Sequence, residues 1–210
     1  MFELVDQPKT FIVAWTTTPW TLPGNVALAI NQDDVVYCKI KNKKSDIKNT
    51  DEKLKIDDDE VLILAKARLA DLFKGENYEI IKEFKGADLI GKKYLPVFDY
   101  YSKDETLKNR DNGWKIYGAD FVTTEDGTGV VHIAPAFGED DMNLGQKENL
   151  PFIQPVAMNG IFKPEVTDFA GMAVKPKSEN EKTRLEADIA VIRYLQEHGN
   201  YFNKEKITHS

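Results

Sequence analysis

Short apolar runs separated by polar segments recur along the first two thirds of the chain, and this pattern predicts a strand-rich fold. Residues 10–16 form a continuous apolar run, which is typical of a strand buried on both faces. Further strands are expected at residues 25–31, 35–41, 60–65, 77–84, 115–123 and 130–134. In the last of these, Val130 and His132 share one face while Val131 lies on the other, and Pro135 ends the strand.

Helical spacing of apolar residues is found in two regions. Residues 66–75 carry a short apolar stripe with Gly75 as a C-terminal stop, and a second short helix is expected to begin near Gly138. From residue 175 onward the pattern changes to one long amphipathic helix. Its stripe consists of Leu185, Ile189, Ile192 and Leu195. We therefore predict an α+β fold with a core at 1–174 and a C-terminal helix with its connection at 175–210.

Two other segments are interpreted from their polar residues. Residues 41–59 are almost entirely charged or polar, which indicates a solvated loop or insertion. Asn112 and Gly113 predict a hairpin turn before the strand at 115–123.

A row of hydroxyls stands out in the segment WTTTPWTLPGN, from Trp15 to Asn25. Threonine favours extended backbone, but Pro19 and Pro23 cannot donate to a strand ladder. The hydroxyls of Thr16, Thr17 and Thr18 are therefore expected where a strand stops. A second group of polar residues, His132 and Asp141, gathers at the end of another predicted strand.

Each of these residues also has an ordinary structural interpretation. Asp141 and Asp140 suit the first turn of a helix, and His132 suits a half-buried strand position with a satisfied ring. The threonines agree with simple β propensity, and Gly-Thr-Gly at 127–129 with a tight turn rather than a phosphate cradle. Neither polar segment contains a serine, cysteine or lysine nucleophile beside a base, so activated water is the better candidate for attack.

Composition narrows the class of protein. The chain has 210 residues, of which 41% are hydrophobic and 30% charged, as in ordinary globular proteins. Its net charge of −7 argues against a stand-alone, tight nucleic-acid binder. The one cysteine, Cys38, allows no internal disulfide, and its apolar neighbours predict a buried thiol in a reducing, cytoplasmic setting. We find no signal peptide, membrane span, zinc motif, P-loop or GxSxG motif in the sequence.

The two polar segments together carry a specific resemblance. WTTTPWTLPGNVALAIN, followed about a hundred residues later by GTGVVHIAPAFGEDD, closely resembles the editing domain of isoleucyl-tRNA synthetase, called connective peptide 1. KGADLIGKKYLPVF and YFNKEKITHS resemble further segments of that family, so the likeness covers essentially the whole chain. Valyl and leucyl relatives usually have Thr-Thr-Arg-Pro and a Lys or Met where this chain has TTTP and His132. The charged residues 41–59 have no match that we can name.

The resemblance implies a ValRS/IleRS/LeuRS-type editing fold with a β-barrel-like core and peripheral helices. It implies hydrolysis of the ester of mischarged Val-tRNA(Ile), and of valyl-adenylate as an additional substrate. The implied catalytic residues are Thr16, Thr17, Thr18 and Asp141, and the implied substrate-binding residues are Trp20, Thr21, Asn25 and His132. Asp141 would bind the α-amino group, His132 would exclude isoleucine, and Trp20 would hold the terminal adenosine.

The resemblance also sets expectations about partners. The chain lacks HIGH-like and KMSKS-like motifs, so amino-acid activation, with its ATP and Mg, would belong to an absent synthetic core. We expect no metal or cofactor in this domain, a valine-charged tRNA(Ile) 3′ end and the rest of the synthetase as partners, and a monomer without membrane contact. Two alternatives stay open: a non-catalytic module that docks the tRNA acceptor end, and a generic small-ester hydrolase.

Overall fold

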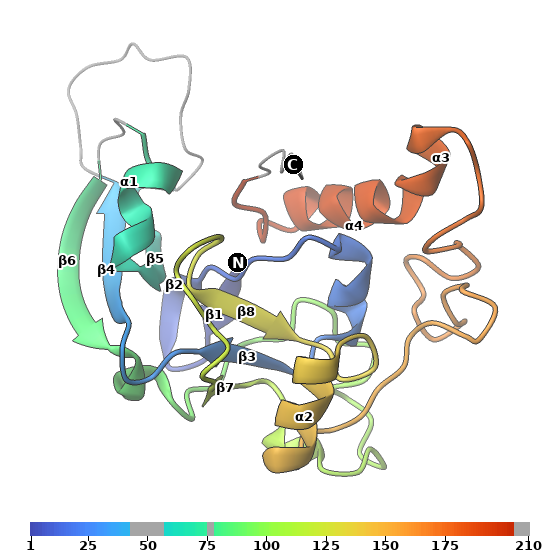
Figure 1. The fold of residues 1–210 in the computed structure, drawn as a ribbon, viewed down its shortest axis with the longest axis horizontal. Helices are drawn as coiled ribbons and strands as arrows, with labels where there is room; N and C mark the ends of the chain where they lie inside the picture. The colour runs from blue at the N-terminus through green and yellow to red at the C-terminus, as the bar shows by residue number, and fades with distance from the viewer. Residues whose placement is uncertain (43–56, 75–77, 204–210) are drawn as a thin grey trace.

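The computed structural model describes residues 1–42, 57–74 and 78–203, and in this part of the chain two mixed β-sheets form the centre (Figure 1). The larger sheet has the strand order β1-β2-β5-β4-β6. Its strands are β1 (Phe2–Leu4), β2 (Gln7–Ile12), β4 (Val36–Asn42), β5 (Val61–Ala65) and β6 (Tyr78–Lys85). β2 runs parallel to β5, and the other neighbours are antiparallel.

The smaller sheet has the order β7-β3-β8, with β3 (Ala27–Ile30) between β7 (Lys115–Gly118) and β8 (Val130–Ile133). β3 pairs in parallel with β7 and antiparallel with β8. All four residues of β3 are fully buried, because it is the central strand and both faces of this sheet are covered.

Helices and single turns cover these sheets. The α-helices are α1 (Leu69–Leu72), α2 (Glu139–Lys147), α3 (Glu181–Arg184) and α4 (Glu186–Glu197). The 3-10 helices are η1 (Pro19–Gly24), η2 (Lys66–Arg68), η3 (Gly86–Leu89) and η4 (Arg110–Asn112). Within the described residues, no helix combines the length and apolar character that crossing a membrane would require.

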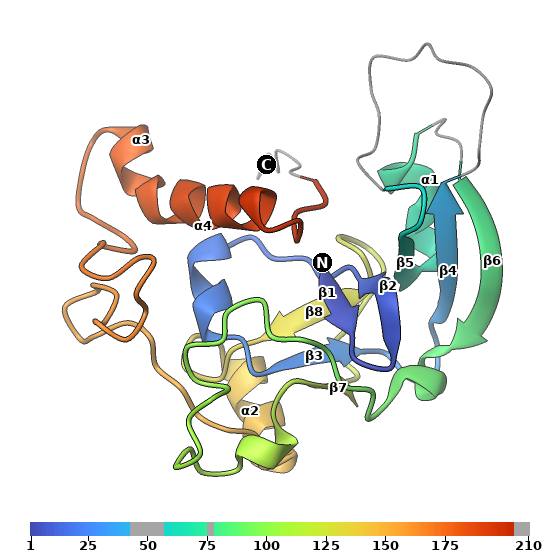
Figure 2. The ribbon, with the colours of Figure 1, turned by 180° about the vertical axis from the view of Figure 1, so that it is seen from behind.

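The smaller sheet lies between α2 and α4. Leu28 of β3 belongs to the same buried cluster as Val191 of α4, whereas Ala29 belongs to a cluster with Leu144 of α2. The 3-10 helix η1, drawn in blue, lies between α4 and this sheet in both ribbon views (Figures 1 and 2). The order α4, η1, small sheet, α2 therefore places the Thr-rich segment directly beneath the C-terminal helix.

Each predicted strand has a counterpart that starts within three residues of the predicted start, but β2 ends at Ile12, short of the end predicted at residue 16. The strand expected at 115–123 is shorter, because only Lys115–Gly118 pairs with β3. Cys38 is fully buried, and burial raises the pKa of its thiol to about 11, so it is inert at neutral pH. The fold class α+β is confirmed. The expected β-barrel-like core is wrong in detail, because the described strands form two separate open sheets and no closed barrel.

The Asn-Gly hairpin turn is also wrong. Asn112 ends η4, Gly113 is extended with φ of −74°, and the left-handed residues are Asn109 and Trp114. The strand that follows pairs in parallel with β3, and a parallel pair needs no tight hairpin. The charged loop at 41–59 and the proposed stop at Gly75 fall mostly or wholly outside the described residues.

The predicted C-terminal helix forms as two helices, α3 and α4, and its buried side differs in part from the predicted stripe. Ala187 and Val191 are fully buried, while Leu185 is 39% exposed. A small residue such as Ala187 lets the helix backbone approach η1 closely. Leu195 of the predicted stripe packs against the same cluster. The division at residue 174 stays a prediction.

Candidate functional site

The threonine row connects a strand to a 3-10 helix. β2 ends at Ile12, and the chain then continues beside β8, where the Trp15 N–H donates to the Val130 carbonyl at 3.0 Å. The Thr16 hydroxyl accepts a hydrogen bond from the Thr18 N–H at 3.1 Å, which turns the chain into η1. The prediction that these hydroxyls lie where a strand stops is confirmed.

His132 is the buried polar residue of β8 and lies opposite Leu28 in the register of the small sheet. Its Nε2 is 2.9 Å from the Thr21 hydroxyl oxygen. The Thr21 hydroxyl donates its single proton to the Thr18 carbonyl at 2.8 Å, so it accepts from His132. This geometry assigns the proton of the neutral ring to Nε2.

The protonation state of His132 follows from its burial. His132 is 6% exposed, and burial lowers its pKa to about 4. At neutral pH the ring is therefore uncharged. Its Nδ1 is an acceptor that is buried and has no hydrogen-bond partner among the described residues.

Asp141 stands in the first turn of α2, where its Oδ2 accepts a hydrogen bond from the Ala134 N–H at 2.8 Å. The helix interpretation and the site interpretation are therefore compatible. Burial is the main cause that raises the pKa of Asp141, the bond from Ala134 opposes it, and the charge of Asp140 adds to the rise. The carboxylate is thus held partly desolvated and in a fixed orientation.

One aromatic contact joins the two polar segments a second time. The Trp20 ring of η1 meets the Phe137 ring edge-to-face, with centroids 5.0 Å apart. Phe137 lies in the short loop between β8 and α2, two residues after Pro135 and four before Asp141. The structure therefore brings the Thr-rich segment, the end of β8 and the start of α2 into one neighbourhood.

Three other predicted site residues have well-defined surroundings. Asn25 is buried, and its side-chain amide donates to the Ala27 carbonyl while accepting from the Tyr94 hydroxyl at 2.6 Å. Trp20 is buried, with the Lys175 ammonium 5.3 Å from its ring centroid. Thr17 is exposed. The substrate roles of these residues stay predictions.

The Gly-Thr-Gly turn is a packing element. Gly127 has φ of +66°, and a Cβ there would lie 2.7 Å from the Trp15 ring. Gly129 has φ of +75°, and a Cβ there would lie 2.5 Å from Ala65. The Thr128 hydroxyl donates to the Val13 carbonyl at 2.6 Å. The tight-turn interpretation is confirmed, because only glycine combines these positive φ angles with such close neighbours.

Sequence reasoning missed Asp188. Its Oδ1 accepts a hydrogen bond from the Trp20 N–H at 2.9 Å, across 168 positions of sequence. The sequence signal at Asp188 is an acid in the first turn of a helix, which is too common to single it out. Among the described residues, no group of three or more His, Cys, Asp or Glu side chains could hold a metal ion.

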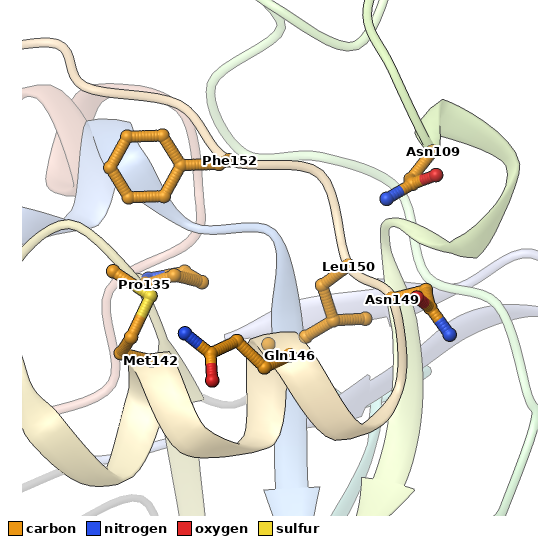
Figure 3. A pocket seen from close by; sticks show the side chains of 8 residues that line it. Asn109, Pro135, Met142, Gln146, Asn149, Leu150 and Phe152 are labelled. Atoms are coloured by element: carbon orange, nitrogen blue, oxygen red, sulfur yellow. The ribbon is translucent and has the colours of Figure 1, made fainter.

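Two hollows lie away from these residues. One of about 270 Å³ borders α2 (Figure 3). It is lined by Asn109, Pro135, Met142, Gly145, Gln146, Asn149, Leu150 and Phe152. Phe152 and Asn109 lie across the hollow from α2. A second hollow of about 450 Å³ is lined mainly by residues 105–112. Neither hollow is lined by a residue that the sequence analysis proposed for the site.

Comparison with curated proteins finds isoleucine–tRNA ligases along the whole chain. The chain is 42% identical to the enzyme of Bdellovibrio bacteriovorus over 213 residues, 38% identical to the probable cytoplasmic enzyme of Dictyostelium discoideum over 218, and 40% identical to the cytoplasmic enzyme of Mus musculus over 217. All of the chain is matched in each case, but it spans only 17%, 18% and 15% of the length of these relatives. No protein-family model matches the chain.

Comparison with solved structures finds leucyl-tRNA synthetase domains. The structure described as GlLeuRS-CP1 has 18% sequence identity and a TM-score of 0.48, over 66% of this chain and 44% of that one. The editing domain of the cytosolic leucyl-tRNA synthetase of P. falciparum has 17% identity and a TM-score of 0.47, over 67% of this chain and 47% of that one.

Proposed function

The chain belongs to the isoleucyl-tRNA synthetase family, and we propose that it hydrolyses the aminoacyl ester of tRNA(Ile) that has been charged with valine. The observation that carries this proposal is the hydrogen bond between Thr21 and His132, which joins two motifs 111 residues apart. Asp141 follows in the same neighbourhood through the Ala134 amide. The full-length relatives are about six times longer, so this activity would be one part of a larger enzyme.

A second, hydrolytic site is needed because a binding pocket for isoleucine can reject valine only weakly. One methylene in an apolar pocket changes binding by only about 1 to 3 kcal/mol, so a site selecting isoleucine accepts valine at an appreciable rate; isoleucyl-tRNA synthetase is itself the standard example. A pocket that admits valine and excludes isoleucine can then remove the error. His132, held on a buried strand and fixed by Thr21, has the rigidity that such a size limit requires.

Asp141 is suited to bind the positive α-amino group of the valyl ester. Its Oδ2 is already oriented by the Ala134 N–H, and partial burial strengthens a charge-assisted bond to an ammonium group. The ester is an activated bond, so orientation of the substrate and of a water molecule supplies much of the required rate. The hydroxyls of Thr16 to Thr18, at the turn into η1, would orient that water and the terminal ribose.

His132 does not act as a general acid at neutral pH in this proposal. Burial lowers its pKa to about 4, so the ring carries no transferable positive charge near pH 7. Its buried Nδ1 can only accept a hydrogen bond. The residue would thus act by its shape and by one acceptor atom.

The test is hydrolysis of Val-tRNA(Ile) and Ile-tRNA(Ile) by this chain at high protein concentration. We expect loss of valine and retention of isoleucine, with the Asp141→Ala variant inactive and the exposed neighbour variant Asp140→Ala active. Tight tRNA binding without hydrolysis would overturn the proposal and favour a docking module. Equal hydrolysis of simple valyl esters that lack tRNA would favour a generic esterase.

A second variant tests the size limit. Replacing His132 with alanine removes the side chain that would exclude isoleucine, so Ile-tRNA(Ile) should become a substrate. Gain of about 10-fold or more in its hydrolysis is expected, since a single steric difference of this kind is worth about 1 to 3 kcal/mol. Unchanged discrimination in a folded His132→Ala protein would remove His132 from the proposed selection.

A further inference from the structure

The 3-10 helix η1 begins without a local cap. Thr18 stands at its N-terminus but makes no side-chain capping bond, and Pro19 has no N–H to offer. The Thr21 N–H bonds back to the Thr18 carbonyl at 3.0 Å. The Trp20 N–H is thus the donor at this helix start that needs an acceptor from outside the helix.

That acceptor comes from the C-terminal helix. Asp188 Oδ1 receives the Trp20 N–H at 2.9 Å, from the first turn of α4. An acceptor oxygen at a helix N-terminus satisfies an otherwise unpaired donor, and here it does so across 168 residues. Asp188 acts as a cap supplied by the tertiary fold.

The approach of α4 to η1 is secured by packing around the bond. Ala187, the residue before Asp188, and Val191, one turn later, are fully buried in the cluster that contains Trp20. The Lys175 ammonium lies over the Trp20 ring from the segment that leads to α3 and α4. Figure 2 shows α4 passing over η1, with the small sheet farther from α4. The carboxylate is therefore placed by the packing of a whole helix.

The capped turn is continuous with the proposed site. The Thr18 carbonyl accepts from both the N–H and the hydroxyl of Thr21, and that hydroxyl accepts the His132 proton. Tilting η1 would move the Thr21 hydroxyl away from His132. The ring would then lose the acceptor that keeps its proton on Nε2. The bond from the Trp20 N–H to Asp188 fixes the start of η1. Thr21, which bonds to the Thr18 carbonyl and to His132, lies in this first turn.

We propose that Asp188 is a positioning residue of the hydrolytic site, and that α4 braces the Thr-rich turn through this carboxylate. The inference rests on the proposed function for its catalytic consequence, and on the Trp20 bond alone for its structural one. Asp188 acts through its acceptor oxygen at the Trp20 N–H. An uncharged acceptor of the same shape should therefore serve.

Three variants separate acceptor from charge. Asp188→Asn keeps an oxygen at the same place, Asp188→Ala removes it, and Asp188→Ser is a milder removal that keeps a polar side chain. The matched control is Glu186→Ala, which removes one negative charge from the same first turn of α4. Glu186 is exposed.

The first measurement is independent of catalysis. Amide hydrogen exchange at Trp20 and the ring nitrogen shifts of His132 are recorded by NMR for each variant of this chain. We expect exchange at Trp20 to rise about 10-fold or more in Asp188→Ala and Asp188→Ser, since one net hydrogen bond is lost. Asp188→Asn and Glu186→Ala should match the parent protein, and the amide of Leu28 should be unchanged in all.

The second measurement is the kinetics of Val-tRNA(Ile) hydrolysis. A displaced turn should lower kcat about 10-fold in Asp188→Ala with KM nearly unchanged, and Asp188→Asn should restore kcat. An unchanged kcat in Asp188→Ala, or an equal loss in Asp188→Asn, would overturn the positioning role. If the parent chain hydrolyses nothing, the proposed function fails, whereas unchanged Trp20 exchange in Asp188→Ala and Asp188→Ser refutes the brace itself.

Discussion

The first turns of α2 and α4 make the same bond for different purposes. Asp141 and Asp188 each stand in the first turn of a helix, and each accepts a backbone N–H from another segment, at 2.8 Å and 2.9 Å. Asp141 bonds to Ala134, seven residues away, and Asp188 bonds to Trp20, 168 residues away. One acid therefore orients the segment after β8, and the other orients η1.

The comparison separates an acid that binds from an acid that supports. Asp141 keeps a partly desolvated charge beside the proposed substrate, which is useful only if a positive group is bound there. Asp188 Oδ1 accepts from the neutral Trp20 amide, and for that bond an acceptor oxygen suffices. The η1 segment and β8 are joined by the hydrogen bond between Thr21 and His132. Changes at this pair therefore test the coupling of both segments.

The largest expected effect distinguishes the two acids. Asp141→Ala should reduce Val-tRNA(Ile) hydrolysis by about 1000-fold, about 4 kcal/mol, because removing one partner of a desolvated charge pair costs about 2 to 5 kcal/mol. Asp141→Asn should lower the hydrolysis rate almost as much, since a neutral amide offers the ammonium group no opposite charge. Rates are measured by single-turnover deacylation. Retained activity in Asp141→Asn would make the two acids equivalent and contradict the distinction.

The next effect is a dependence of the free energy of unfolding on pH, caused by His132. Burial lowers the pKa of His132 to about 4 from 6.5, so between these values the unfolded chain binds a proton that the folded chain does not. The contribution of His132 to stability is complete above pH 6.5 and falls by about 3 kcal/mol as the pH drops to 4. Urea unfolding at pH 7 and pH 4 measures it.

Two substitutions control that experiment. His132→Gln should flatten the difference in the free energy of unfolding between pH 7 and pH 4, because the titrating ring is gone. His198→Gln, at an exposed histidine, should leave the difference as it is in the parent chain. If the free energy of unfolding differs equally between pH 7 and pH 4 in the parent and in His132→Gln, burial does not lower the pKa of His132.

The smallest expected effect comes from removing the hydrogen bond between Thr21 and His132. Thr21→Val leaves the buried Nε2–H of His132 without an acceptor, which should cost about 1 to 3 kcal/mol in the free energy of unfolding. Thr21→Ser keeps the hydroxyl and should cost less. Denaturant unfolding at pH 7 compares them. A Thr21→Val protein as stable as Thr21→Ser would mean that η1 and β8 are not coupled through this bond.

The sequence was informative where structure is locally encoded. The apolar runs that became β3, β4, β5 and β8 could be placed because alternating or continuous burial is visible in neighbouring residues. The start of α2 after Gly138 could be placed from its acids and the preceding proline. The hairpin predicted at Asn112 was wrong, because the strand after it pairs with β3, which lies far away in sequence.

The candidate site divides along the same line. Thr16 to Thr18, His132 and Asp141 were nominated by motif, and the sequence by itself also predicted that the threonines lie where a strand stops. Only the tertiary structure decided that Thr21 sets the tautomer of His132 and that Asp188 caps η1. Only it decided that α4 buries Ala187 and Val191 while Leu185 is left exposed. Short-range pattern specifies whether a segment is strand or helix, but bonds between residues more than 100 positions apart depend on how those segments pack.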